Sequence, residues 1–136
     1  MSATYPTTVT VTHRNAAGTV SNSRTYETET FQPIKVTLTS SQANKKVDVA
    51  FPYARLKSII VKTPVDIHIY TNAASSGSPA NTLVIASETG LDWDVDSGFT
   101  NPFSANVTSF YFTNDEAVAV TADNPIEILI ALDPTA

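Results

Sequence analysis

The chain has 136 residues, a net charge of −5 and no cysteine. This length suits one domain with a single hydrophobic core, and the lack of cysteine excludes disulfides, a thiol nucleophile and cysteine-ligated metal centres. The acidic net charge argues against nucleic acid as the main partner. No stretch approaches the roughly 20 apolar residues of a membrane span, and the first residues lack the basic and apolar regions of a signal peptide. We therefore expect synthesis in a cytoplasm, no membrane partner and no export by a cleaved signal.

Opposite charges are separated along the chain. All eight Lys and Arg residues lie before residue 63, whereas ten of the thirteen Asp and Glu residues lie after it. Such segregation indicates complementary surfaces that meet within one molecule, between copies, or between this chain and a charged partner.

The first 31 residues are polar and rich in Thr and Ser. Apolar residues at Val9 and Val11 alternate with threonines, and Gly18 marks a turn. This pattern predicts a hairpin from Val9 to Phe31. Its faces are weakly apolar, so two interpretations stay open: an arm that packs on a neighbour, or an edge hairpin of the main fold.

Residues 32–136 alternate between apolar and polar side chains with a period of two, which is typical of β-strands. Lys57–Val61 is apolar on both faces, as expected of a central strand. The other expected strands are centred on Ile34–Leu38, Val47–Phe51, Val65–Tyr70, Leu83–Ile85, Phe110–Phe112, Val118–Val120 and Ile126–Leu132. About ten short strands at this spacing predict one all-β domain, an antiparallel β-sandwich of the jelly-roll type, with residues 1–31 as a hairpin or arm.

The segment Asp92–Gly98 contains three carboxylates at a spacing of two, Asp92, Asp94 and Asp96. Oxygen ligands in such a loop could hold calcium, although the segment departs from the EF-hand pattern. The other interpretation is a solvated acidic edge above a core-facing Trp93. A third is a sugar site, in which Trp93 provides a stacking platform beside hydrogen-bond acceptors.

Catalytic motifs are absent from the sequence. His13 and His68 lie in different expected strands, and no metal-binding His pair, nucleophile elbow or phosphate-binding glycine loop is present. We therefore expect no enzymatic activity and no cofactor. Tyr70 and Tyr111 occupy polar faces of expected strands, where an aromatic ring with a polar tip suits a subunit or ligand interface.

From Leu56 to the end, the chain resembles the small jelly-roll decoration, or cement, proteins of tailed bacteriophage capsids. The resemblance is carried by Leu56–Ile60, Pro64–Asn72, Thr82–Ile85, Leu91–Trp93, Asn101–Phe103, Val107–Asn114 and Ile126–Pro134. It implies a structural virion protein that binds the outer surface of a phage head as a homotrimer, stabilises the shell and has the major capsid protein lattice as its partner.

This resemblance suggests an assembly role for basic residues in the part of the chain that precedes it. We expect Arg14, Arg24, Lys45 and Lys46 to contribute to contacts between copies or with the capsid; the alternative is that these cations only solubilise loops or neutralise acids within one molecule. A rival function is a carbohydrate- or receptor-binding jelly roll, possibly tail-associated, for which an exposed aromatic platform at Trp93 or Tyr70 is expected. A small esterase or glycosidase on the same frame is a further alternative.

Overall fold

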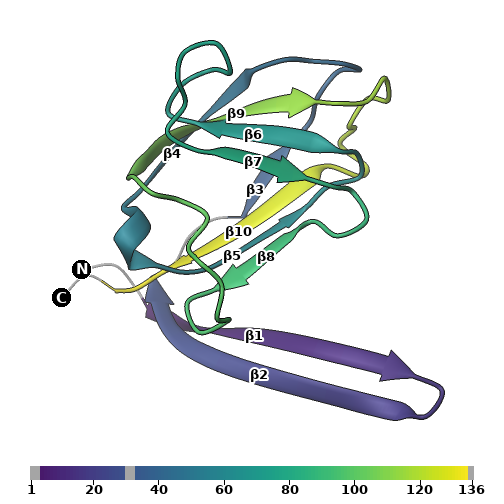
Figure 1. Ribbon diagram of the computed structural model, residues 1–136, viewed down its shortest axis with the longest axis vertical. Coiled ribbons are helices and arrows are strands. Elements are labelled where there is room, and N and C mark those ends of the chain that lie inside the picture. Colours follow the sequence, from purple (N-terminus) through teal and green to yellow (C-terminus); the bar gives the residue numbers. More distant parts are fainter. Residues whose placement is uncertain (1–3, 30–32, 135–136) are drawn as a thin grey trace.

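The computed structural model describes residues 4–29 and 33–134, which form ten strands and one short 3₁₀ helix. The strands are β1 (Thr4–Asn15), β2 (Gly18–Glu29), β3 (Ile34–Val36), β4 (Lys45–Phe51), β5 (Leu56–Lys62), β6 (Ile67–Thr71), β7 (Thr82–Ile85), β8 (Leu91–Asp94), β9 (Val107–Asn114) and β10 (Ile126–Leu132), and the helix η1 spans Tyr53–Arg55. All strand pairs are antiparallel (Figure 1).

Strands β3 to β10 form a sandwich of two sheets. One sheet has β10 at its centre, paired with β3 on one side and β5 on the other, and β5 pairs with β8. The second sheet has the order β4-β9-β6-β7. The chain crosses repeatedly between the sheets, so sequence neighbours such as β4 and β5 lie in different layers. This arrangement confirms the predicted jelly-roll sandwich.

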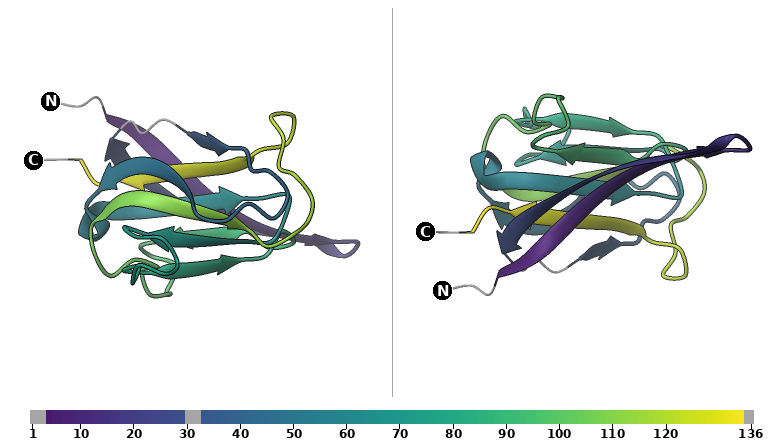
Figure 2. Two further views of the ribbon diagram at one scale, coloured as in Figure 1. Left: turned by 90° about the horizontal axis from the view of Figure 1, so that it is seen from above. Right: turned by 90° about the horizontal axis from the view of Figure 1, so that it is seen from below.

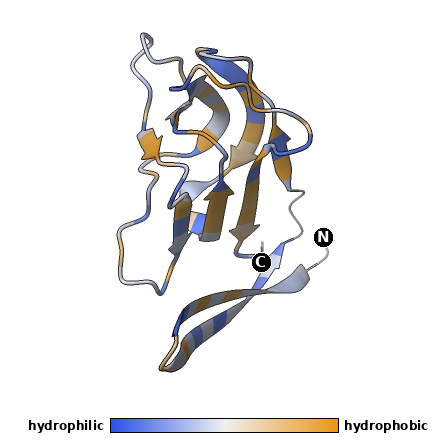
Figure 3. Ribbon diagram, turned by 90° about the vertical axis from the view of Figure 1, so that its right-hand side faces the viewer, coloured by the Kyte–Doolittle hydropathy of each residue, from blue (hydrophilic) through white to orange (hydrophobic). Residues whose placement is uncertain are grey.

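The core lies between the two sheets, where alternate residues of each strand point inward. Phe110 is fully buried at its centre, and its ring packs against those of Phe51, Phe103 and Phe112 at centroid distances of 6.2, 6.1 and 6.0 Å. Figure 3 shows the hydrophobic residues concentrated on the sandwich strands, whereas the hairpin alternates between hydrophobic and hydrophilic residues.

The first two strands form a long hairpin outside the sandwich. Every residue of β1 pairs with one of β2, from Thr4 opposite Glu29 to Asn15 opposite Gly18. At the turn, the Asn15 side chain accepts a hydrogen bond from the Ala17 backbone N–H at 2.8 Å. The hairpin is therefore confirmed and begins earlier than predicted, at Thr4. Phe31, its predicted end, lies outside the described residues.

Only the base of the hairpin joins the sandwich sheet. Glu29 at the end of β2 pairs with Leu132 of β10, the single register position shared by those strands. From there the hairpin crosses the outer face of the β3-β10-β5-β8 sheet and its turn extends past the body (Figures 1 and 2). The hairpin thus extends as an arm, and it is also paired at its base with β10 as the last two strands of the sheet, so it has features of both sequence interpretations; its packing on a neighbour stays a prediction.

One detail of the strand prediction was wrong. Val118 and Val120 do not form a strand, because Val120 makes only an isolated bridge with Leu38 and Val118 is exposed. The prediction that Lys57–Val61 is a central strand is confirmed, because β5 lies between β10 and β8; Ile60 on its outer face is half exposed. The hairpin crosses only part of that face, which leaves Ile60 uncovered.

Candidate interface at the N-terminal hairpin

The outer face of the β10-β5-β8 sheet is organised in rows of paired residues. Ile59, Ile130 and Trp93 point into the core. Because side chains alternate along a strand, the residues directly before and after each of them in its strand point outward. The strand register places Ser58 between Ala131 and Asp94 in one row, and Ile60 between Leu129 and Asp92 in the next. The first row is buried and the second is open to solvent.

Asp94 in the buried row anchors the hairpin to the sandwich. The Arg24 guanidinium of β2 donates to its carboxylate through Nε at 2.5 Å and Nη2 at 2.8 Å, and the Tyr26 hydroxyl donates at 2.6 Å. The Asp94 side chain is 3% exposed and that of Arg24 is 23% exposed. The Tyr26 hydroxyl also lies 3.2 Å from a carboxylate oxygen of Asp96.

The titration of these groups reflects their close contact. The hydrogen bond from Arg24 holds the pKa of Asp94 below its usual value, against the opposing effect of burial. The hydrogen bond to Asp94 raises the pKa of Arg24. Burial, followed by the hydrogen bond to Asp94, raises the pKa of Tyr26 to about 12. All three effects favour a charged carboxylate and a protonated phenol at neutral pH, so the anchor is fully formed there.

A second ionic contact holds the base of the hairpin. Arg55 of η1 donates to the Glu29 carboxylate at 2.7 Å and also to the backbone carbonyl of Asp133. Since Glu29 ends β2 and Asp133 follows β10, this arginine joins the hairpin base to the last strand of the sandwich. The hairpin is consequently fixed at two points along its length.

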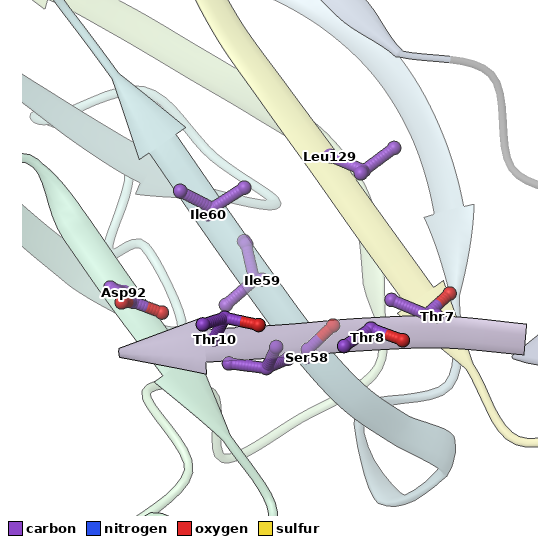
Figure 4. A pocket seen from close by; sticks show the side chains of 9 residues that line it. Thr7, Thr8, Thr10, Ser58, Ile59, Ile60, Asp92 and Leu129 are labelled. Carbon is purple, nitrogen blue, oxygen red and sulfur yellow. The ribbon is translucent and has the colours of Figure 1, made fainter. Parts of the chain in front are cut away.

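A groove separates β1 from the open row of the sheet. It has a volume of about 310 Å³ and is lined by Thr7, Thr8, Val9 and Thr10 on β1 and by Ser58, Ile59, Ile60, Asp92 and Leu129 on the sheet (Figure 4). Ile60 is 50% exposed and Leu129 is 42% exposed. The groove therefore has an apolar floor that the molecule leaves partly in water.

The wall of this groove is the unpaired edge of β1. Backbone groups of an antiparallel strand point alternately toward its partner and away from it. Pro6 has no N–H to donate to a partner strand, and it occupies a position whose backbone groups point away from β2. Thr8 and Thr10 follow at intervals of two residues, so their backbone N–H and C=O groups point to the same outer edge of β1. Their side chains bond to Thr25 and Ser23 across the hairpin at 3.0 and 2.9 Å. The backbone groups of this edge have no strand partner among the described residues.

The four basic residues that were predicted to lie at an interface differ from one another in their contacts. Arg24 forms the intramolecular anchor, Lys45 donates to the Thr37 carbonyl at 2.7 Å, and Lys46 lies 3.7 Å from Asp48 with both side chains exposed. Arg14 lies next to the hairpin turn and has no ion-pair partner among the described residues. Part of the charge segregation is thus neutralised inside one molecule, by Arg24 with Asp94 and by Lys35 with Glu127 at 3.9 Å.

Three of the residues that were predicted to lie at an interface are neighbours on the opposite side of the sandwich. Lys46 pairs with Tyr111, which pairs with Tyr70, in one row across the outer face of the β4-β9-β6 sheet. The Tyr70 ring stacks on His68 with a centroid distance of 5.8 Å, and His68 Nδ1 lies 2.6 Å from an Asp115 carboxylate oxygen. This half-exposed aromatic row is a second candidate surface.

The Asp92–Asp96 segment does not have the geometry expected of a calcium site. Asp94 is engaged by Arg24 and Tyr26, so its oxygens face a cation and a donor that the protein itself supplies. Among the described residues no three His, Cys, Asp or Glu side chains gather where they could hold a metal ion. The acidic edge is also not fully solvated as one interpretation had it, because Asp94 is buried.

The predicted stacking platform at Trp93 is buried in the core. Its indole N–H donates to the Phe99 carbonyl at 2.9 Å, and the ring faces away from the groove. Trp93 therefore cannot stack on a sugar in this conformation. The sequence pattern did not identify the surface that does stand open, the Ile60 and Leu129 row, because the alternation along one strand does not show what covers its outer face.

Comparison with known proteins gives no assignment: no family model, no curated protein and no solved structure matches this chain. Within residues 4–29 and 33–134, no helix is long and apolar enough to cross a membrane.

Proposed function

We propose that this chain is a structural assembly protein without enzymatic activity. The observation that carries the proposal is the hairpin, an arm anchored at Arg24 and Arg55 that extends past the sandwich; beyond its base, its outer strand edges have no strand partner within residues 4–29 and 33–134. Exposed strand edges readily pair with other chains, and native proteins usually cover or block them. An arm of this length and regularity suits a contact with another protein surface.

The specific assembly that we propose is a phage head. The segment from Leu56 to the end resembles capsid decoration proteins, and the jelly-roll sandwich that it forms together with β3 and β4 is compatible with that class. The chain would bind the outer surface of the major capsid protein lattice, as a homotrimer, and stabilise the shell. Many copies on one lattice multiply a modest contact energy per copy.

Binding to isolated shells tests this function. Expanded capsids of the phage that encodes the chain are stripped of it, incubated with purified protein and sedimented. We expect saturable co-sedimentation and a higher temperature of capsid disruption. Chain that stays in the supernatant at all concentrations, with shells of unchanged thermal stability, would refute the decoration role.

A carbohydrate- or receptor-binding role is the second candidate, favoured by the Tyr70 and Tyr111 row. Tyrosine rings on an open sheet face provide apolar area with hydroxyl groups at the tips. A glycan array screened with wild-type chain and with Tyr70→Ala tests it. Binding that the substitution abolishes would support this candidate, and a blank array would remove it.

A further inference from the structure

The outer part of the hairpin, residues 11–22, presents apolar side chains that its own body does not cover. Val11 pairs with Asn22, and His13 pairs with Val20, on the same face of the hairpin as Arg24 and Tyr26. This is the face that docks on the sandwich nearer the base. In the overhanging part, Val11 is 36% exposed and Val20 is 76% exposed. We call residues 11–22 the distal hairpin.

The distal hairpin also has two open backbone edges. Among the described residues, β1 pairs only with β2, and β2 pairs elsewhere only at Glu29. The turn extends past the sandwich in the views of Figures 1 and 2. It can therefore approach a second molecule before the two bodies meet.

The groove between β1 and the sheet has the complementary features. Its floor exposes Ile60 and Leu129, and its wall offers the free edge of β1 around Thr8 and Thr10 (Figure 4). An added strand in this position would pair with the backbone of the wall and cover the floor with alternate side chains, as in recognition by strand addition.

Charge supports a second copy as the occupant. The hairpin contains no acidic residue between Tyr5 and Tyr26, and its tip carries Arg14. The groove contains Asp92, which is exposed and has no ion-pair partner within the part of the chain that the structure describes. A basic arm thus matches a groove whose one charged lining residue is acidic.

We propose that the distal hairpin of one molecule enters the groove of a second copy. The outer edge of the incoming β2 pairs with the open edge of β1, and Val11 and Val20 cover Ile60 and Leu129. The contact joins two different surfaces, so one molecule of a bound pair still has a free arm and the other still has a free groove. Repetition of such a contact closes into a ring or continues as a chain. This contact goes beyond the proposed function, since it needs no capsid.

Solution mass against concentration, measured by sedimentation velocity with the isolated full chain, tests the contact. An arm variant carries Val11→Thr and Val20→Thr, and a floor variant carries Ile60→Thr and Leu129→Thr. We expect each variant to raise the concentration of half-association by roughly tenfold or more. Val84→Thr, which changes a 74% exposed residue on the opposite sheet, is the matched control and leaves association unchanged.

A mixture of the arm variant and the floor variant tests whether the arm of one molecule binds the groove of another. The floor variant keeps an intact arm, and the arm variant keeps an intact groove, so together they form one good contact. We expect a 1:1 dimer that does not grow further, at concentrations where each variant alone is a monomer. An unaltered fluorescence spectrum of the single tryptophan, Trp93, verifies the fold of each variant.

Asp92→Lys provides an independent variant at an exposed position. It places a cation opposite the basic arm, so association weakens, and the salt dependence of wild-type association is lost. The proposal is overturned if wild-type chain stays monomeric at every concentration up to the millimolar range. It is equally overturned if the mixture of arm and floor variants fails to restore the dimer. Because no capsid enters these measurements, they are independent of the shell-binding test.

Discussion

Replacing Asp94 with Asn should loosen the hairpin from the sandwich. The change keeps the side-chain volume but puts an NH₂ group where a carboxylate oxygen accepts from Arg24, and a guanidinium can only donate. One of the contacts at 2.5 and 2.8 Å therefore becomes a meeting of two donors. The remaining amide oxygen is a neutral acceptor, which binds Arg24 or Tyr26 more weakly than a carboxylate.

The expected loss follows from the exposure of the two partners. Hydrogen bonds to charged groups contribute roughly 1.5–3 kcal/mol each. Asp94 is 3% exposed, so water cannot replace the lost partners on its side. The partial exposure of Arg24 reduces the cost, because water solvates the freed guanidinium. We expect Asp94→Asn to lower the free energy of unfolding by about 2 kcal/mol at pH 7.

Urea denaturation followed by Trp93 fluorescence measures this change, and amide hydrogen exchange of the hairpin peptides shows where it occurs. Asp96→Asn is the matched control, since Asp96 is exposed and its only side-chain hydrogen bond in the described chain comes from Tyr26 at 3.2 Å. The control should change stability by less than about 0.5 kcal/mol. Equal stability and equal hairpin protection in wild type and Asp94→Asn would refute the anchoring role.

The acid dependence of stability tests the same contact. The pKa of Asp94 is lower in the folded chain than its ordinary value of 3.8. The unfolded chain therefore binds the proton more readily, and the contribution of Asp94 is present above pH 3.8 and is lost as the pH falls through the folded pKa. Wild type should lose more stability than Asp94→Asn below pH 3.8. Parallel acid titrations of the two proteins would contradict this assignment.

Three further predictions concern the anchor, a turn and the core. The pKa of Tyr26 is about 12 in the folded chain against an ordinary value of 10.0. Its contribution to the free energy of unfolding is therefore present below pH 10 and is lost as the pH rises through 12. Tyr26→Phe should remove this alkaline loss of stability in urea titrations, and an unchanged profile would contradict it. Gly90 has a φ of +62°, and a Cβ at this position would clash with the Val61 carbonyl oxygen. Gly90→Ala should therefore lower the free energy of unfolding by at least about 1 kcal/mol in the same assay. An unchanged stability would show that the turn can shift. Phe110→Ala should cost about 3–5 kcal/mol, whereas Phe99→Ala, at a 77% exposed position, should cost less than about 0.5 kcal/mol; similar losses would refute the placement of the core.

Much of the fold was predictable because alternation is a local signal. Ile126, Ile128 and Ile130 alternate with other residues, and all three are buried in β10. Val118 and Val120 carry the same pattern but form no strand, because only Val120 finds a partner, Leu38. The pattern of a strand shows which face is apolar, whereas the existence of the strand depends on a neighbour with which to pair.

The candidate sites were less predictable. Lys46 was singled out for its charge, and Tyr70 and Tyr111 for their aromatic rings on polar faces. The strand register brings the three into one row. Trp93 was a candidate for stacking on a ligand, but the alternation of side chains along β8 places it on the face that points into the core. Nothing local distinguishes an inward from an outward tryptophan, because a shift of register by one residue exchanges the two faces.

By itself the sequence determined the fold class, the polar hairpin near the start and the separation of charges, because each depends on the order of residues along the chain. Only the tertiary structure decided that Arg24 is paired with Asp94 while Arg14 stays free of ion pairs among the described residues. The tertiary structure also decided that the hairpin leaves Ile60 and Leu129 open. These outcomes depend on where the hairpin crosses the outer face of the sheet, which brings Arg24 to Asp94, 70 positions away in the chain, a contact that no local pattern encodes.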